Sequence, residues 1–286
     1  MQVPTVGLLE RLRQDRPLVA IELRPPRSDL SAAESMDTWI DMNHAIRRLG
    51  HLDTVLFLTD RAVGKAEEEN LHHLTANLAG EFSPSRVVPF LTCKHTLDYC
   101  LMFATRAASH GLEALTVLGG DRSVGPPRCV EHAYQLRQHI RQRVSSLQLG
   151  GWAAPHRDPQ EQVAFILQPE FEAEFYLTQV VSHHGVLSVE RFLDEASHRN
   201  VPYPPVFGVF FYRSANPKTL EFLARYFPVP ATQLAREFDS GVSAEEICAR
   251  TIRGLRAIGA DKVYVSNLGI RGAAERYRKI IAAVEG

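Results

Sequence analysis

The sequence feature that most constrains the fold is a short apolar run that ends in a single polar residue, a pattern that recurs along the chain. Residues 114–118, Ala-Leu-Thr-Val-Leu, are followed by Gly119, Gly120 and Asp121. A continuous apolar run of this length is typical of a strand that is buried on both faces in a parallel sheet. The glycines allow a sharp turn or a close approach to a ligand. Asp121 is therefore predicted to lie at the C-terminal end of a buried strand.

Four other apolar runs end in the same way. The polar residues that follow them are Glu22, Thr59, Thr92 and the pair Thr178-Gln179. In α/β barrels, the residues at the C-terminal ends of the strands form the active site. The five exits therefore predict one cluster of polar side chains at one end of a closed sheet.

Strand-like and helix-like segments alternate through the chain. Strands are expected at residues 19–22, 55–59, 87–92, 114–120, 147–153, 175–179, 205–211 and 262–266. Helices are expected at residues 32–49, 67–78, 97–110, 128–144, 160–173 (with a break at Pro169), 188–198, 217–226, 244–258 and 273–284. Eight β/α units in 286 residues predict an α/β fold, a single (β/α)8 TIM-type barrel in which residues 1–286 form one catalytic domain.

Composition excludes several classes of partner. The net charge is −1, so there is no electrostatic argument for a nucleic-acid or anionic-membrane partner. No apolar segment approaches the ~20 residues of a membrane span, and charged residues within 11–16 interrupt any signal-peptide core. The four cysteines have no CxxC spacing, which favours a reducing compartment. We expect a cytoplasmic protein with small-molecule partners, and the sequence makes no prediction of its oligomeric state.

Two pairs of adjacent histidines, His72-His73 and His183-His184, suggest metal ligands at first sight. Adjacent residues on a helix do not face one ion, and no carboxylate or cysteine completes a ligand set. We therefore interpret both pairs as surface histidines and expect no metal site.

The strand-exit residues also resemble those of the methylenetetrahydrofolate reductase family. The matching residues, in the order and spacing of that family, are Glu22 with Pro25-Pro26, Thr59, Leu91-Thr92-Cys93, Gly120-Asp121 and Thr178-Gln179. The resemblance spans nearly the whole chain and implies a (β/α)8 barrel. It also implies reduction of 5,10-methylenetetrahydrofolate to 5-methyltetrahydrofolate, normally with NAD(P)H as the electron source and FAD as the hydride carrier.

The resemblance implies roles for individual residues. Glu22 stands at the position of the general acid that protonates N10 of the folate, and its apolar strand is expected to raise its pKa; the alternative is a glutamate paired with Arg24. Asp121 and Gln179 match the residues that contact the pterin, and Asp121 is also assigned to catalysis, with Thr59 beside them in substrate binding. The alternatives are a helix N-cap for Asp121 and a polar residue satisfied within the protein for Gln179.

Four positions depart from the family pattern: Phe90 replaces a histidine, Gly119 an arginine, Ala154 a tyrosine and Gln168 a lysine. These changes remove cations and hydrogen-bonding rings from the surface that holds FAD. Each charge-assisted contact to a phosphate contributes roughly 1.5–3 kcal/mol. The chain therefore resembles the flavin-independent branch of the family, and FAD is expected to be absent unless Arg122, Arg157 or His156 supplies the lost contacts.

Without a flavin, NADH and folate must be bound together, with nicotinamide C4 ~3–3.5 Å from the folate methylene carbon. The chain has no GxGxxG motif after a strand, so NADH is expected to contact barrel loops. The candidate NADH contacts are Thr92, Trp152, Arg122 and His156. The rings of Phe211 and Tyr212 are candidates for stacking on the substrate, with core packing as the alternative for both.

Two other functions remain open at this point. One is the same reaction through bound FAD, and the other is a folate-binding homologue without catalysis. The sequence does not choose between NADH and NADPH, because no acidic residue follows a glycine fingerprint to contact the ribose.

Overall fold

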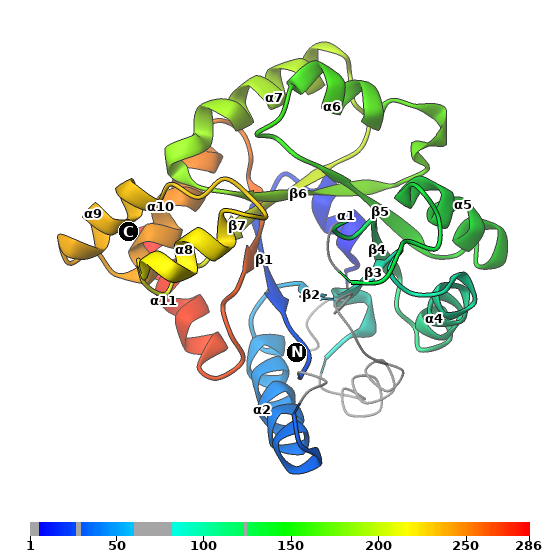
Figure 1. The fold of residues 1–286 in the computed structure, drawn as a ribbon, viewed down its shortest axis with the longest axis horizontal. Coiled ribbons are helices and arrows are strands. Elements are labelled where there is room, and N and C mark those ends of the chain that lie inside the picture. The colour runs from blue at the N-terminus through cyan, green and yellow to red at the C-terminus, as the bar shows by residue number, and fades with distance from the viewer. Residues whose placement is uncertain (1–5, 27–29, 60–81, 123–124) are drawn as a thin grey trace.

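The computed structural model describes residues 6–26, 30–59, 82–122 and 125–286. Eight parallel strands close into a barrel in sequence order, and β1 pairs with β8 (Figure 1). The strands are β1 (Leu18–Leu23), β2 (Leu56–Leu58), β3 (Val87–Thr92), β4 (Ala114–Leu118), β5 (Gln148–Ala153), β6 (Phe175–Val181), β7 (Pro205–Phe210) and β8 (Lys262–Ser266). The (β/α)8 class predicted from the sequence is confirmed.

Helices surround the barrel and connect its strands (Figure 1). The α-helices are α1 (Leu8–Arg13), α2 (Ala32–Gly50), α4 (Leu97–Ser109), α5 (Ala133–Arg143), α6 (Pro159–Ile166), α7 (Val186–His198), α8 (Pro217–Leu223), α9 (Ala231–Asp239), α10 (Ala244–Ala257) and α11 (Ala273–Glu285). The described segments also contain the 3-10 turns η1 (Pro84–Arg86), η2 (Pro169–Phe171) and η3 (His183–Gly185). The helix predicted at residues 67–78 lies outside the described residues.

Local sequence signals set several helix boundaries. At the start of α2, the backbone N–H of Glu34 donates to Ser31 Oγ, and the backbone N–H of Ser31 donates to the Glu34 carboxylate. This reciprocal capping box fixes the first turn. The predicted break at Pro169 is confirmed, since α6 ends at Ile166 and Pro169 begins η2. Helix α5 begins at Ala133 instead of near residue 128, because the backbone N–H of Cys129 donates to the Cys93 carbonyl, 2.7 Å away, outside any helix.

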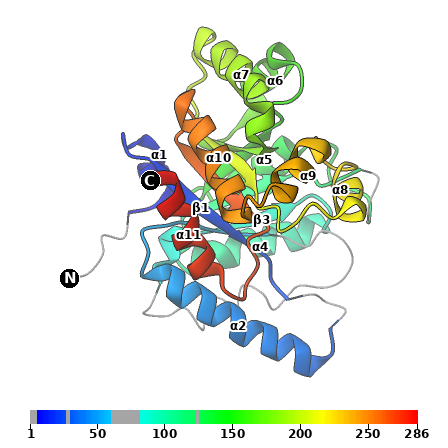
Figure 2. The same ribbon diagram turned by 90° about the vertical axis from the view of Figure 1, so that its left-hand side faces the viewer.

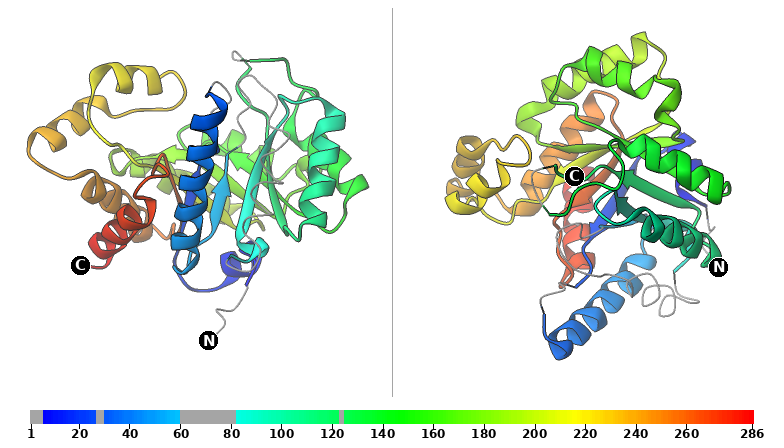
Figure 3. Two further views of the ribbon diagram at one scale, coloured as in Figure 1. Left: turned by 90° about the horizontal axis from the view of Figure 1, so that it is seen from below. Right: turned by 45° about the vertical axis from the view of Figure 1, so that its right-hand side comes forward.

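The inside of the barrel is filled by alternate residues of the strands. The rings of Phe57, Phe90 and Tyr264 meet there, with ring centroids 5.8 Å apart for Phe57 and Phe90 and 5.7 Å apart for Phe57 and Tyr264. Leu8 and Leu12 of α1, a helix that the sequence analysis did not predict, pack against the same cluster. Figure 3 (left) shows α1, in dark blue, beneath the lower ends of the strands. The N-terminal end of the barrel is therefore plugged, and its mouth lies at the C-terminal end.

The outward-facing residues of the strands pack against the helices in a second apolar layer. Around β1, for example, Val19 and Ile21 lie in one cluster with Ile46 of α2, Ile252 of α10 and Ile280 of α11. Figure 2 shows these three helices beside β1. None of the helices in the described part of the chain is long and apolar enough to cross a bilayer.

Candidate active site at the mouth of the barrel

Glu22 lies near the C-terminal end of β1, and its side chain faces the inside of the barrel. The strand alternates faces, and Leu18 and Ala20 on the same face belong to the interior cluster. Only 6 % of Glu22 is exposed. The Ser266 hydroxyl, at the end of β8, donates a hydrogen bond to Glu22 Oε1 over 2.9 Å. Neighbouring strands therefore hold this carboxyl at the barrel mouth.

Burial raises the pKa of Glu22, because a charged carboxylate is poorly solvated there. The charge of Arg24 and the hydrogen bond from Ser266 act in the opposite direction and do not reverse the shift. Arg24 Nε lies 3.7 Å from Glu22 Oε1, but its side chain is 59 % exposed. The pairing with Arg24 considered as an alternative is therefore present and weak. Glu22 has the environment of a carboxylic acid that keeps its proton to higher pH than usual.

Ser266 was missed by the sequence analysis, although it carries the same signal as the residues that were found. It is the polar residue at the exit of the apolar strand β8. In the register of β7 and β8, Phe210 is paired with Ser266 and Gly208 with Tyr264. Paired residues of parallel strands share a face, so Phe210 lies on the same side of the sheet as Ser266.

Asp121 follows the glycine turn at the end of β4 and is exposed. Gly120 has a φ of 71°, in the left-handed region that favours glycine. The N-cap of α5 is His132, so the alternative in which Asp121 begins that helix does not hold. Asp121 thus remains a candidate for ligand binding at the rim of the mouth.

Two cations that sequence analysis did not single out lie against this turn. Arg128 donates to the carbonyls of Gly120 and Glu131, and a Cβ atom on Gly119 would lie 2.8 Å from its guanidinium carbon. Lys94 is 5 % exposed, and its ammonium donates to the carbonyl of Pro126 over 2.9 Å. Among the described residues, neither cation forms an ion pair with a carboxylate. Gly119, read from the sequence as a lost arginine, makes room for an arginine from elsewhere in the chain.

Gln179 lies near the end of β6 and is half-buried. Its Nε2 donates a hydrogen bond to the carbonyl of Tyr226, between α8 and α9, over 2.6 Å. The sequence alternative of a polar residue satisfied within the protein therefore holds for the amide nitrogen. The amide oxygen is the atom of Gln179 that remains to accept a hydrogen bond from a ligand.

Thr59, Thr92 and Trp152 belong to the same end of the barrel. The backbone N–H of Thr59 donates to the Leu23 carbonyl over 3.0 Å, which places Thr59 beside the end of β1. Thr92 is the last residue of β3 and is paired in register with Leu118 of β4. Trp152 of β5 is half-buried and packs against the interior cluster. The structure thus brings these three predicted residues to the rim that holds Glu22.

The placement of Phe211 corrects the aromatic prediction. Phe211 is buried in the outer layer, in the cluster that contains Phe207 and Val209, so it packs behind β7. Tyr212 is also buried and packs against Phe210, with ring centroids 4.9 Å apart. Strand alternation, which sends Phe211 outward, makes Phe210 the aromatic residue of this strand on the same side of the sheet as Ser266.

The remaining two cofactor candidates differ in character. Arg122 is exposed, next to Asp121. His156 is half-buried just after β5, and its Nδ1 has no hydrogen-bond partner among the residues that the structure describes. Burial and the charge of Arg157 lower the pKa of His156. His156 is therefore a poor source of positive charge for a phosphate at neutral pH.

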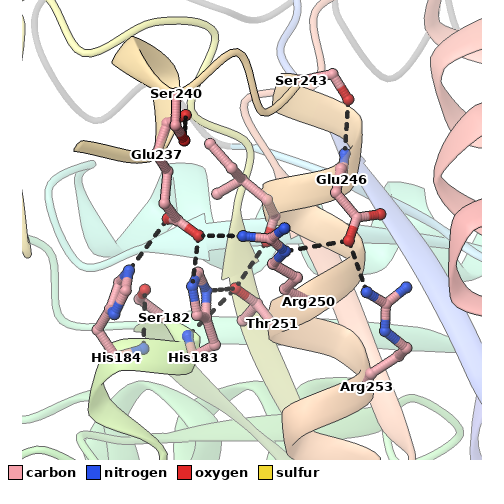
Figure 4. Close-up of polar contacts among 11 residues, drawn as sticks. Ser182, His183, His184, Glu237, Ser240, Ser243, Glu246, Arg250, Thr251 and Arg253 are labelled. Carbon is pink, nitrogen blue, oxygen red and sulfur yellow. Dashed lines mark hydrogen bonds and ion pairs between the residues drawn. The ribbon is translucent and has the colours of Figure 1, made fainter. Parts of the chain in front are cut away.

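The expectation that no carboxylate completes a ligand set at His183-His184 is wrong. Glu237 on α9 accepts a contact from each ring: His183 Nε2 lies 3.1 Å from Oε1, and His184 Nε2 lies 3.1 Å from Oε2 (Figure 4). Burial lowers the pKa of His183, aided by the charge of His184. Burial would raise the pKa of Glu237, but hydrogen bonds from His184 and Arg250 and the histidine charges lower it. A carboxylate does complete this set, whereas His72-His73 lies outside the described residues.

Proteins of known structure share the fold of this chain. No protein-family model matches the chain, and no curated protein matches it. A protein from Clostridium thermocellum, described as binding two copies of 5-methyl-5,6,7,8-tetrahydrofolic acid, matches with a TM-score of 0.66 and 19 % identity, over 96 % of this chain and 100 % of that one. A structure of apo-MsnO8 matches with a TM-score of 0.55 and 15 % identity, over 94 % of this chain and 98 % of that one. At these identities the likeness shows a shared barrel fold.

Proposed function

We propose that this protein binds a reduced folate at the barrel mouth and reduces 5,10-methylenetetrahydrofolate to 5-methyltetrahydrofolate, with hydride transferred directly from NADH. The observation that carries the proposal is Glu22, a buried carboxyl of raised pKa at the C-terminal end of β1. It stands where the resemblance to methylenetetrahydrofolate reductases puts the general acid. The fold shared with a protein that binds 5-methyltetrahydrofolate supports a folate ligand.

The reaction needs one proton and one hydride. Protonation of N10 breaks its bond to the methylene carbon and leaves an electrophilic iminium at N5. Hydride addition to that carbon then gives the N5-methyl group, and N10 keeps the proton. Glu22 supplies the proton, since a carboxyl with raised pKa retains it to higher pH than usual and can release it in the transition state.

The rim residues provide contacts for both ligands. Asp121 accepts hydrogen bonds from the amino-pyrimidine edge of the pterin, and Gln179 accepts one through its amide oxygen. Trp152 and Phe210 supply aromatic surface on which a flat ring can stack. The proposal thus assigns the pterin to the side of the mouth from β4 to β7.

The cations at the glycine turn suit the phosphates of a dinucleotide. Arg128 and Lys94 donate to backbone carbonyls and form no ion pair with a carboxylate of the described residues. A bound phosphate would therefore neutralise their charges. Charge-assisted hydrogen bonds of this kind are roughly twice as strong as neutral ones. Thr92 lies across the same β3–β4 edge and adds a hydroxyl to this region.

The residues at the other family positions fit a flavin poorly. Phe90 and Ala154 are buried and apolar, so neither offers a hydrogen bond to an isoalloxazine ring. Arg128 and Lys94 favour a pyrophosphate without choosing between NADH and FAD. The same reaction through FAD is therefore the second candidate, since these two cations suit the pyrophosphate of either molecule.

The test is turnover by flavin-free protein. Protein dialysed until it has no flavin absorbance is given NADH and methylenetetrahydrofolate, and we expect NADH oxidation with formation of 5-methyltetrahydrofolate. Activity that appears only after FAD is added would select the second candidate. Folate binding by calorimetry without turnover under either condition would instead identify a folate-binding protein without catalysis.

A further inference from the structure

We propose that His183, His184 and Glu237 form a binding site for a divalent transition-metal cation of the zinc class, on the flank of the barrel beside β6. The inference is independent of the proposed function, since it concerns side chains on η3 and α9 and requires neither folate nor NADH. Figure 4 shows the two imidazole rings side by side, with their outer nitrogens directed at one carboxylate.

The spacing of the ligand atoms suits a metal ion. One nitrogen from each histidine and one oxygen of Glu237 all lie within 4.8 Å of one another. Bonds of about 2.0–2.2 Å at near-tetrahedral angles place ligand atoms about 3.3 Å apart. Each histidine already stands at about that spacing from one of the two carboxylate oxygens, since His183 Nε2 lies 3.1 Å from Oε1 and His184 Nε2 lies 3.1 Å from Oε2. Metal binding therefore requires only small movements of the three side chains.

The outer contacts hold two of the ligands in the orientation that metal binding needs. The Thr251 hydroxyl lies 3.0 Å from His183 Nδ1 and accepts a hydrogen bond from the backbone N–H of the same histidine over 3.2 Å. This contact directs Nε2 toward Glu237. Metal-bound histidines commonly have such a partner on the second ring nitrogen.

Arg250 orients the carboxylate of Glu237 in a similar way. Its guanidinium donates to Glu237 Oε1 over 2.9 Å and to Glu246 Oε1 over 3.1 Å (Figure 4). Glu237 Oε2, the oxygen near His184, is left as the ligand atom. The second carboxylate, on Glu246, offsets the positive charge of the arginine beside the cation.

The chemistry of the set selects the class of metal. Two imidazoles and one carboxylate suit zinc, cobalt or nickel, whereas calcium and magnesium prefer oxygen ligands. The side chains of His183, His184 and Glu237 are 17 %, 23 % and 13 % exposed, so an ion can reach them from solvent. Three protein ligands leave a fourth position for water.

A bound ion would link two segments of the chain, η3 after β6 and helix α9. His183 and His184 follow β6 directly, and Glu237 lies on α9, 53 residues after His184. The chain before α9 carries Tyr226, whose carbonyl holds the amide of Gln179. The ion would therefore stiffen the connection between the end of β6 and the α8–α9 segment.

The experiment titrates metal-free protein with Zn²⁺ by calorimetry and with Co²⁺ by visible absorption. We expect one ion per chain and the absorption bands of four-coordinate Co²⁺. His184→Gln and Glu237→Gln should each weaken Zn²⁺ binding by at least about 100-fold, since loss of even an outer-shell contact costs about 10–100-fold. The matched control is His139→Gln with His198→Gln, which removes two exposed histidines on α5 and α7 and should leave binding unchanged.

His184→Gln is the sharper variant, because His184 contacts Glu237 and leaves the bonds of His183 and Arg250 to that carboxylate in place. Its thermal unfolding without metal checks that the protein is folded. Zn²⁺ should raise the melting temperature of the unaltered protein and of the control but not that of His184→Gln. Equal Zn²⁺ affinity in the unaltered protein and His184→Gln, or loss of binding in the control, would overturn the site.

Discussion

Replacing Ser266 by alanine tests the electrostatic account of Glu22 most directly. The Ser266 hydroxyl donates to Glu22 Oε1 over 2.9 Å, and this bond favours the charged carboxylate. Without it, the pKa of Glu22 should rise further above its usual value. Because Glu22 acts as an acid in the proposed reaction, activity is lost as pH rises through its pKa. The falling limb of the pH profile of kcat/KM should therefore move to higher pH in Ser266→Ala.

The effect of Ser266→Ala can also be expressed as a change in the free energy of unfolding. Burial raises the pKa of Glu22 in the folded state, so the stability that this group contributes is fully present below its unfolded pKa. That stability is lost as pH rises through the folded pKa. A hydrogen bond to a charged group contributes about 1.5–3 kcal/mol. Ser266→Ala should thus cost about that much where Glu22 is ionised, and less at pH 4, where the carboxyl is protonated.

The assay is urea unfolding of both proteins from pH 4 to pH 9, with the ionisation of Glu22 followed separately by NMR of its side-chain carboxyl carbon. Glu22→Gln combined with Ser266→Ala is the control, because the pH dependence of the serine substitution should vanish when no carboxylate is present. A cost of Ser266→Ala that is the same at every pH, or a Glu22 pKa that falls, would refute the reasoning.

Four further predictions address the site and the fold. Glu22→Gln should lower turnover about 10²–10⁴-fold while folate affinity, measured by calorimetry, changes far less; a variant that keeps half the rate would contradict the acid role. Asp121→Asn and Gln179→Ala should each weaken folate binding by about 1–3 kcal/mol with a smaller effect on NADH, and unchanged folate affinity in both would remove them from the pterin site. Direct hydride transfer predicts sequential kinetics and deuterium passing from nicotinamide C4 to the product methyl group, whereas ping-pong kinetics would point to a carrier. Leu8→Ala should lower the free energy of unfolding by about 2–5 kcal/mol in urea, since Leu8 is fully buried where α1 plugs the barrel. A loss below about 1 kcal/mol would mean that α1 does not close the barrel.

Sequence patterns predicted what depends on neighbours along the chain. The strand at residues 87–92 is observed with those bounds as β3, because a continuous apolar run has few alternatives to a buried strand. Glu22 could be predicted for the same reason, as the polar residue at a strand exit. Helix α9 was missed although its residues are amphipathic, because the segment is only nine residues long and buries a single side chain, Leu234.

The hydrogen-bond partners of the site residues could not be predicted from the sequence, because the closed barrel brings together residues that are far apart in the chain. Glu22 and Ser266 are separated by 244 residues, and Arg128 reaches Gly120 only through the path of the chain before α5. The argument against His183-His184 assumed a regular helix. Those residues lie instead in a 3-10 turn, with ring centroids 3.9 Å apart, and their carboxylate comes from the helix that the pattern missed.

The pairing of the first and last strands links the chemistry to closure of the barrel. Val19 is paired in register with Val263, and the Tyr277 hydroxyl of α11 donates to the Val19 carbonyl. Strand β1, which carries Glu22, is therefore translated long before β8, which covers this carboxyl and supplies Ser266. Contacts of such sequence separation form late and slowly. The acid acquires its altered proton affinity only when β1 and β8 pair, so an unclosed barrel carries an ordinary surface glutamate.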